Sequence, residues 1–129
     1  MTTNLTASLV KKVLTDSKVA GEDMSSSQYK LVALETDGTV DLCDAAADKA
    51  YGVLLNNPTS GQIAEIGLLG IYPVQANVAL GEGDIIAPST DGQAQVAVTT
   101  QYPCGHVVKP AGAAGELAMA FISPAVSII

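Results

Sequence analysis

Few residues in this chain have side chains suited to chemistry. There is one histidine, His106, and there are two cysteines, Cys43 and Cys104. Cys104 and His106 lie two residues apart in a predicted strand, where alternate side chains share a face, so we expect the thiol and the imidazole on one side. This pair supplies two of the four ligands of a closed zinc site, and a Cys–His nucleophile pair normally comes from distant positions. We therefore predict no catalytic residue, no metal and no cofactor.

The two cysteines are too few for a disulfide framework. We expect both to be reduced and buried in a protein made in the cytoplasm, with a single bridge as the alternative if they face each other. The first residues lack the charged start, apolar run and cleavage site of a signal peptide. No window approaches the ~20 apolar residues that span a bilayer, so no membrane partner is expected.

Two Asp-Gly pairs are better explained as turns than as acidic sites. Asp37-Gly38 and Asp91-Gly92 each lie between two short apolar runs. Asp-Gly favours a type I′ hairpin turn, because both residues tolerate positive φ. The neighbouring acids show neither the spacing nor the closing glutamate of an EF-hand loop. We therefore assign Asp37, Gly38, Asp91 and Gly92 to hairpin turns.

The composition excludes further classes of protein. Hydrophobic residues make up 48% of the 129 residues and charged residues 15%, which argues against disorder. The net charge is −7 and all six basic residues are lysines, whereas nucleic-acid binders need clustered cations and usually arginine. Nucleic acid is therefore not an expected partner. The charge is uneven: residues 1–30 carry a net +1, and residues 31–129 carry −8.

The remaining pattern is that of β structure. From Tyr29 onward, short apolar runs alternate with clusters of Gly, Asp, Asn and Pro. One short segment, Asp44–Ala50, is a helix candidate with Asp44 as its cap. The predicted strands are 31–35, 39–43, 51–56, 62–69, 70–75, 84–87, 93–99, 105–109, 116–123 and 125–129.

These strands form two repeats. Leu31–Gly38 and Ile85–Gly92 match at an offset of 54 residues, and the glycine-led runs that start at Gly52 and Gly105 match at nearly the same offset. Each repeat of ~50 residues is too small to bury its own apolar face, so the two must pack on each other. We predict an all-β fold, a small pseudo-two-fold β-barrel or β-tulip-like domain over residues 29–129.

Residues 1–28 differ from the rest of the chain. They are rich in Thr and Ser, contain three of the six lysines, and end in a polar run. We expect an extended N-terminal arm that becomes ordered on a partner. A small apolar set is available for burial there, at spacings that also fit one face of a short helix: Leu5, Leu9, Val10, Val13 and Leu14.

The repeat, the Ala/Gly/Val-rich composition and the closing run Ala120–Ile129 resemble those of tailed-phage head decoration proteins, in particular the lambda-like family of capsid cement proteins. The resemblance covers residues 29–129. It implies a homotrimer on the exterior of the virion's expanded capsid, which stabilises the shell against internal DNA pressure. It also implies that the arm, residues 1–28, docks on the major capsid protein, and that there is no active site.

Two other classes of function stay open. The first is a phage or bacterial β-barrel binding module, for a fibre, a receptor or a carbohydrate. The absence of tryptophan and the acidic charge count against it, because sugar-binding platforms are usually aromatic. The second is a trimeric β-barrel enzyme with a site between subunits, which would need acids from different chains.

Overall fold

The computed structural model describes residues 10–44, 48–98 and 101–123, and these residues form nine β-strands and no helix. The predicted all-β class is therefore confirmed. No helix of the described residues is long and apolar enough to cross a membrane. The strands are β1 (Lys11–Val19), β2 (Leu31–Leu34), β3 (Val40–Leu42), β4 (Gly52–Leu54), β5 (Ile63–Gln75), β6 (Ile85–Pro88), β7 (Ala94–Val96), β8 (Gly105–Lys109) and β9 (Leu117–Ile122).

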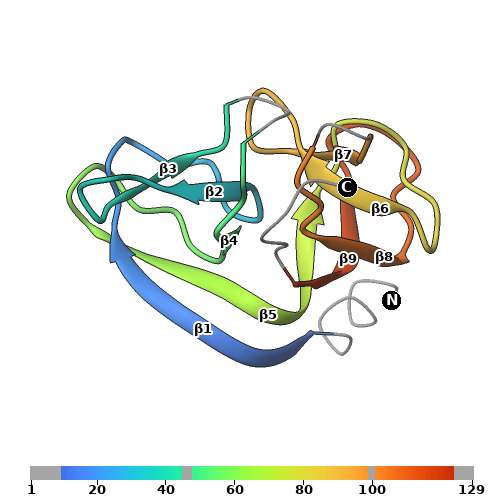
Figure 1. The fold of residues 1–129 in the computed structure, drawn as a ribbon, viewed down its shortest axis with the longest axis horizontal. Coiled ribbons are helices and arrows are strands. Elements are labelled where there is room, and N and C mark those ends of the chain that lie inside the picture. The colour runs from blue at the N-terminus through green and yellow to red at the C-terminus, as the bar shows by residue number, and fades with distance from the viewer. Residues whose placement is uncertain (1–9, 45–47, 99–100, 124–129) are drawn as a thin grey trace.

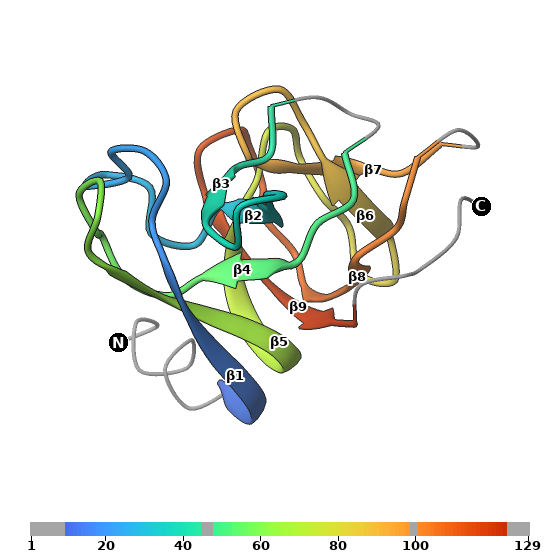
Figure 2. The ribbon, with the colours of Figure 1, turned by 60° about the vertical axis from the view of Figure 1, so that its left-hand side comes forward.

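All nine strands belong to one sheet in the order β3-β2-β4-β5-β9-β8-β6-β7, with β1 paired to β5 outside this path. Every pairing of neighbours is antiparallel. Figures 1 and 2 show the sheet curled into an open, barrel-like shape with two lobes, one around β2 to β4 and one around β6 to β9. The long strands β1 and β5 run together along one side of the molecule.

Strand β5 joins the two lobes. Its first part pairs with β4, and residues 70–75 pair with β9. The sequence predicted two strands here, 62–69 and 70–75, but the structure has one strand of 13 residues. Gly70 accounts for the difference: it has φ +135°, and a Cβ there would overlap the Lys11 carbonyl oxygen of β1. Glycine thus bends the strand without ending it.

The two repeats recur in the backbone hydrogen bonds as well as in the sequence. Two parallel bridges occupy equivalent places, Ala20 with Val40 and Ala76 with Ala94. The residue after β1 therefore pairs with the second hairpin strand of the first repeat, as the residue after β5 pairs with that of the second repeat. Further equivalent donor–acceptor pairs are Glu35 N to Thr39 O and Ser89 N to Gln93 O, both 2.8 Å, and Tyr29 N to Leu54 O and Gly83 N to Val107 O, 2.7 and 2.8 Å.

Within the predicted arm, residues 1–28, strand β1 lies in the sheet and Ala20 and Met24 lie in the core, so the described part of this segment packs on the predicted body, residues 29–129. β1 pairs with β5 from Lys11 to Val19. Ala20 and Met24 are 1% and 0% exposed and belong to a core cluster with Val32. The segment escaped prediction because most of β1 is exposed and carries no alternating apolar pattern.

Asp37-Gly38 and Asp91-Gly92 close the hairpins β2–β3 and β6–β7, but not with the predicted type I′ turn. Among the described residues, Tyr29 is the one non-glycine residue with positive φ, whereas Gly38 and Gly92 have φ +86° and +82°. This is the geometry of a type I turn followed by a glycine bulge. Asp37 Oδ1 accepts hydrogen bonds from the amide and hydroxyl of Thr39 (3.0 and 2.7 Å), which favours this turn.

Two other predictions fall partly outside the described residues. The helix candidate Asp44–Ala50 includes residues 45–47, which are not described, and its described residues are not helical. The predicted strand 125–129 also lies outside them.

Candidate functional site

Strand β1 is the most exposed strand of the described sheet. Most of its nine residues are exposed and, among the described strands, it pairs with β5 alone, so one edge of its backbone faces outward. Val13 and Leu14 are 66% and 52% exposed, whereas Val10, just before the strand, packs against the main core. Of the five predicted docking residues, Leu5 and Leu9 lie outside the described residues. Val13 and Leu14 are thus exposed apolar residues on a strand whose second edge pairs with no other described strand.

A buried tyrosine fixes the backbone beneath this pair. The pairing of β1 with β5 shifts register between Lys12 and Thr15, which indicates a bulge. The Tyr72 hydroxyl lies 3.2 Å from the Leu14 carbonyl oxygen and 3.0 Å from that of Leu69, and the residue is 0% exposed. The Tyr72 ring has room because Gly67 faces it, where a Cβ would come within 2.7 Å of the ring. Burial raises the pKa of Tyr72, so the hydroxyl remains a donor.

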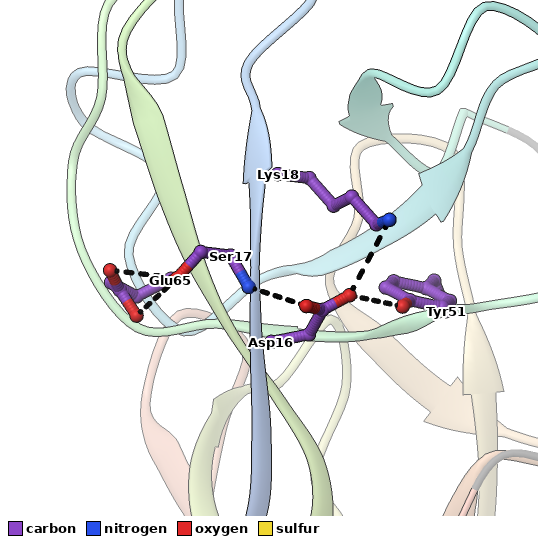
Figure 3. A network of polar contacts seen from close by, with 5 residues as sticks. All are labelled: Asp16, Ser17, Lys18, Tyr51 and Glu65. Carbon is purple, nitrogen blue, oxygen red and sulfur yellow. Dashed lines mark hydrogen bonds and ion pairs between the residues drawn. The ribbon is translucent and has the colours of Figure 1, made fainter.

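A polar network holds the second half of β1 to the body (Figure 3). Asp16 accepts a hydrogen bond from the Tyr51 hydroxyl, which comes from the segment before β4, and lies 3.7 Å from the Lys18 ammonium. Ser17 donates to the Glu65 carboxylate on β5 at 3.1 Å. β1 is therefore attached on two sides, to β5 and to the first lobe.

The two partners of the central hydrogen bond shift each other's ionisation. The pKa of Asp16 is lowered, first by the Tyr51 hydroxyl and then by the Ser17 amide and Lys18. The pKa of Tyr51 is raised, first by the same hydrogen bond. Asp16 is thus ionised and Tyr51 protonated at neutral pH, the states in which this contact forms.

The cysteine and histidine side chains do not form a site. Cys43 and Cys104 are both free thiols, 0% and 1% exposed in the main core cluster. Burial raises the pKa of Cys104 to about 12 and that of Cys43 further, so neither is a thiolate at neutral pH.

Cys104 and His106 do not share a face, contrary to the sequence prediction. Cys104 comes just before β8 and is buried, whereas His106 is exposed and packs on the Phe121 ring with centroids 5.7 Å apart. The alternation fails because the two residues are not in one regular strand: β8 begins at Gly105, whose Cα lies so close to β9 that a Cβ would overlap the Phe121 carbonyl oxygen.

An acidic hollow lies beside the first hairpin. Its volume is about 890 Å³, and its rim includes six acids and one lysine: Glu22, Glu35, Asp41, Asp44, Asp48, Asp91 and Lys49. Burial, followed by neighbouring carboxylates, raises the pKa of Glu35 and of Asp41. One oxygen of Asp41 is buried without a hydrogen-bond partner among the described residues. Among all the residues that the structure describes, no three His, Cys, Asp or Glu side chains are placed to hold a metal.

No family model and no curated protein matches this sequence. Among solved structures, the fold is similar to that of the head fiber gp8.5 N base of bacteriophage phi29, with a TM-score of 0.62 and 18% sequence identity. The match covers 88% of this chain and 98% of that chain, so it extends over both repeats. At this identity the likeness shows the fold, and the barrel-like all-β architecture is the property that the two proteins share.

Proposed function

We propose that this chain is a structural protein of a tailed-phage head, which binds the outside of the expanded capsid as a homotrimer and stabilises the shell. The observation that carries the proposal is the fold shared with the phi29 head fiber N base over 88% of the chain. The resemblance of the sequence to capsid decoration proteins points to the same class independently.

Strand β1, with the residues before it, is the surface that we propose for the capsid. Its outward edge offers backbone donors and acceptors for an added strand, and Val13 and Leu14 add apolar contact. Lys11, Lys12 and Lys18 give it positive charge on an otherwise acidic protein. This charge would orient β1 toward an acidic shell and keep the acidic body away from it.

The base of a fibre is a second candidate, because the similar phi29 structure is a head fiber N base. Both candidates need attachment to the head, and they differ in what lies beyond the attached domain. A fibre base would carry further chain or a further protein, whereas a cement protein would act through the attached domain alone.

Sedimentation with capsids tests the proposal. Purified protein is added to expanded capsids that lack it, and the bound fraction is measured after pelleting. We expect saturable binding and a higher temperature of capsid disruption, because each bound copy holds neighbouring shell subunits together. Binding without any gain in capsid stability would favour the fibre base, and no binding at all would refute the proposal.

Charged substitutions locate the docking surface. Val13→Asp with Leu14→Asp should weaken capsid binding by roughly tenfold or more, because a carboxylate would be buried at the contact. The matched control is Val78→Asp with Leu117→Asp, which places the same two charges on residues 42% and 41% exposed, beyond the end of the β1–β5 pairing at Ile71. Equal binding of the two variants would show that β1 is not the docking surface.

A further inference from the structure

The second repeat contacts the first through the tip of its hairpin. The Leu31 amide donates to the Gly92 carbonyl at 2.6 Å, and the Lys30 ammonium lies 4.0 Å from the Asp91 carboxylate. Leu42 also contacts this tip, since a Cβ on Gly92 would come within 3.2 Å of its side chain. Leu31 is 0% exposed and belongs to the main core cluster together with Ala94, which follows this tip. The tip of one repeat thus covers the first residues of the leading hairpin strand of the other.

Both surfaces of this contact recur in the molecule, and neither has the matching partner among the residues that the structure describes. The equivalent tip, Asp37-Gly38, projects from the first repeat, and a Cβ on Gly38 would meet no described atom within 4 Å. The equivalent of Leu31 is Ile85, which is 50% exposed. Its amide has no acceptor among the described residues that corresponds to the Gly92 carbonyl. Each chain therefore has one tip and one receiving strand in contact, and one of each left over.

The hairpin tip and the strand that receives it are different surfaces, so one contact between two repeats leaves one tip and one receiving strand free. If the repeats were related by an exact two-fold axis, both tips would be engaged. A head-to-tail contact instead leads on to a further copy, and it ends in a ring if the rotation closes. The two unfilled surfaces are thus duplicates of two surfaces that already fit each other in this fold.

We infer that copies of this chain associate by the same contact, the Asp37-Gly38 tip of one chain covering Ile85 of the next. The inference rests on the proposed homotrimer and names its interface: three chains give a closed ring of six repeats. In this ring the Ile85 amide donates to the Gly38 carbonyl of the neighbouring chain, as Leu31 does to Gly92 within the chain.

The contact between chains is weaker than the contact within the chain. Asp84 replaces Lys30 at the receiving strand, so the Asp37 tip meets a carboxylate in place of an ammonium. Both acids have partners within their own loops, Asp84 accepting from the Gly81 amide at 2.8 Å and Asp37 from Thr39. Because two like charges approach, added salt strengthens the association. Asp37→Asn keeps a turn-forming side chain and strengthens it as well.

Cross-linking tests the interface in the full chain. Asp37→Cys, Asp84→Cys and the double variant are treated with a short bis-maleimide; the native cysteines are buried and do not compete. A head-to-tail contact links the double variant into species up to the trimer, and a mixture of the two single variants into dimers. Neither single variant links to itself. Self-linking of one single variant, or a ladder beyond the trimer, would overturn the inference.

A surface variant gives a second readout if a cysteine variant does not fold. Ile85→Lys should raise the concentration at which trimers dissociate by roughly tenfold or more, because the tip then covers a charge. The control is Ile63→Lys. Ile63 is the first residue of β5 and is 51% exposed, and its substitution should leave association unchanged. This interface alone would be overturned if light scattering shows trimers, but the cysteine variants do not cross-link and Ile85→Lys does not weaken association. A wild-type chain that stays monomeric at ~100 µM, well above a micromolar Kd, would overturn the homotrimer itself.

Discussion

Alanine substitutions at two equivalent glycines can be compared to measure how much the contact between the repeats stabilises the protein. Gly38 and Gly92 occupy the same place in the two hairpins, with φ +86° and +82°. Alanine at either position has to adopt this left-handed conformation, which costs about 1–2 kcal/mol. At Gly38 this is the whole expected loss in the free energy of unfolding, because no described atom lies within 4 Å of an added Cβ.

At Gly92 the same substitution also disturbs the packing of the repeats. The added Cβ would lie 2.9 Å from the Leu31 carbonyl oxygen and 3.2 Å from the Lys30 and Leu42 side chains. Overpacking costs about 1–3 kcal/mol, and losing the Leu31–Gly92 hydrogen bond costs about 1 kcal/mol. We therefore expect Gly92→Ala to destabilise the protein by about 2–4 kcal/mol more than Gly38→Ala.

Urea unfolding of the two variants and the wild type provides the assay. The effect of alanine on the unfolded chain is the same at both positions and cancels in the difference. Measurements at low protein concentration keep association through Gly38 out of the result. Equal losses of stability in the two variants would refute the reasoning, since they would show that the hairpin tip adds nothing beyond its own turn.

Three further predictions concern the buried and acidic residues. Tyr72→Phe should destabilise the protein by about 1–2 kcal/mol and speed amide hydrogen exchange near Leu14, because the carbonyl at the β1 bulge loses its donor; unchanged exchange would contradict this. Cys43 and Cys104 should react with a thiol reagent at neutral pH at a rate set by unfolding, as checked in rising urea, and fast reaction without urea would contradict their burial. Asp41→Asn should stabilise the protein at pH 7, because the raised pKa of Asp41 means that folding disfavours its charge; the gain should disappear as pH falls below about 4, as thermal unfolding across pH would show.

The sequence predicted the repeated part of the fold because that part follows local rules. Alternating apolar runs and Asp-Gly pairs placed both hairpins, and the offset of 54 residues paired them. The turn type was wrong, because a dipeptide does not distinguish a two-residue loop from a three-residue loop with a glycine bulge. The Asp37 hydrogen bonds to Thr39 decide between the two, and they depend on the residue after the pair.

Strand β1 was not predicted, because its stability comes from contacts far along the chain. Tyr51 and Tyr72, with Glu65, supply the side-chain contacts that hold it, and they lie 35 to 58 residues from their β1 partners. One signal was present: Gly70 in an otherwise apolar run marks where the backbone of β1 approaches β5, and Gly67 leaves room for the Tyr72 ring of β5 itself. The failed Cys104–His106 prediction has a similar origin, a glycine whose close contact ends the alternation of side chains.

The strand that both lobes share has a mechanical consequence. β5 is ~40 Å long when followed along its bend at Gly70, given the usual rise per strand residue. Tension applied to one lobe therefore reaches the other along a covalent backbone that also carries the hydrogen bonds of β1, β4 and β9. Because β1, β4 and β9 all pair with this one strand, melting of either lobe would leave an edge of the shared strand β5 unpaired, so unfolding should be all-or-none. Under a pulling force, such a domain would unfold in one step, whereas two domains joined by a linker would unfold one after the other.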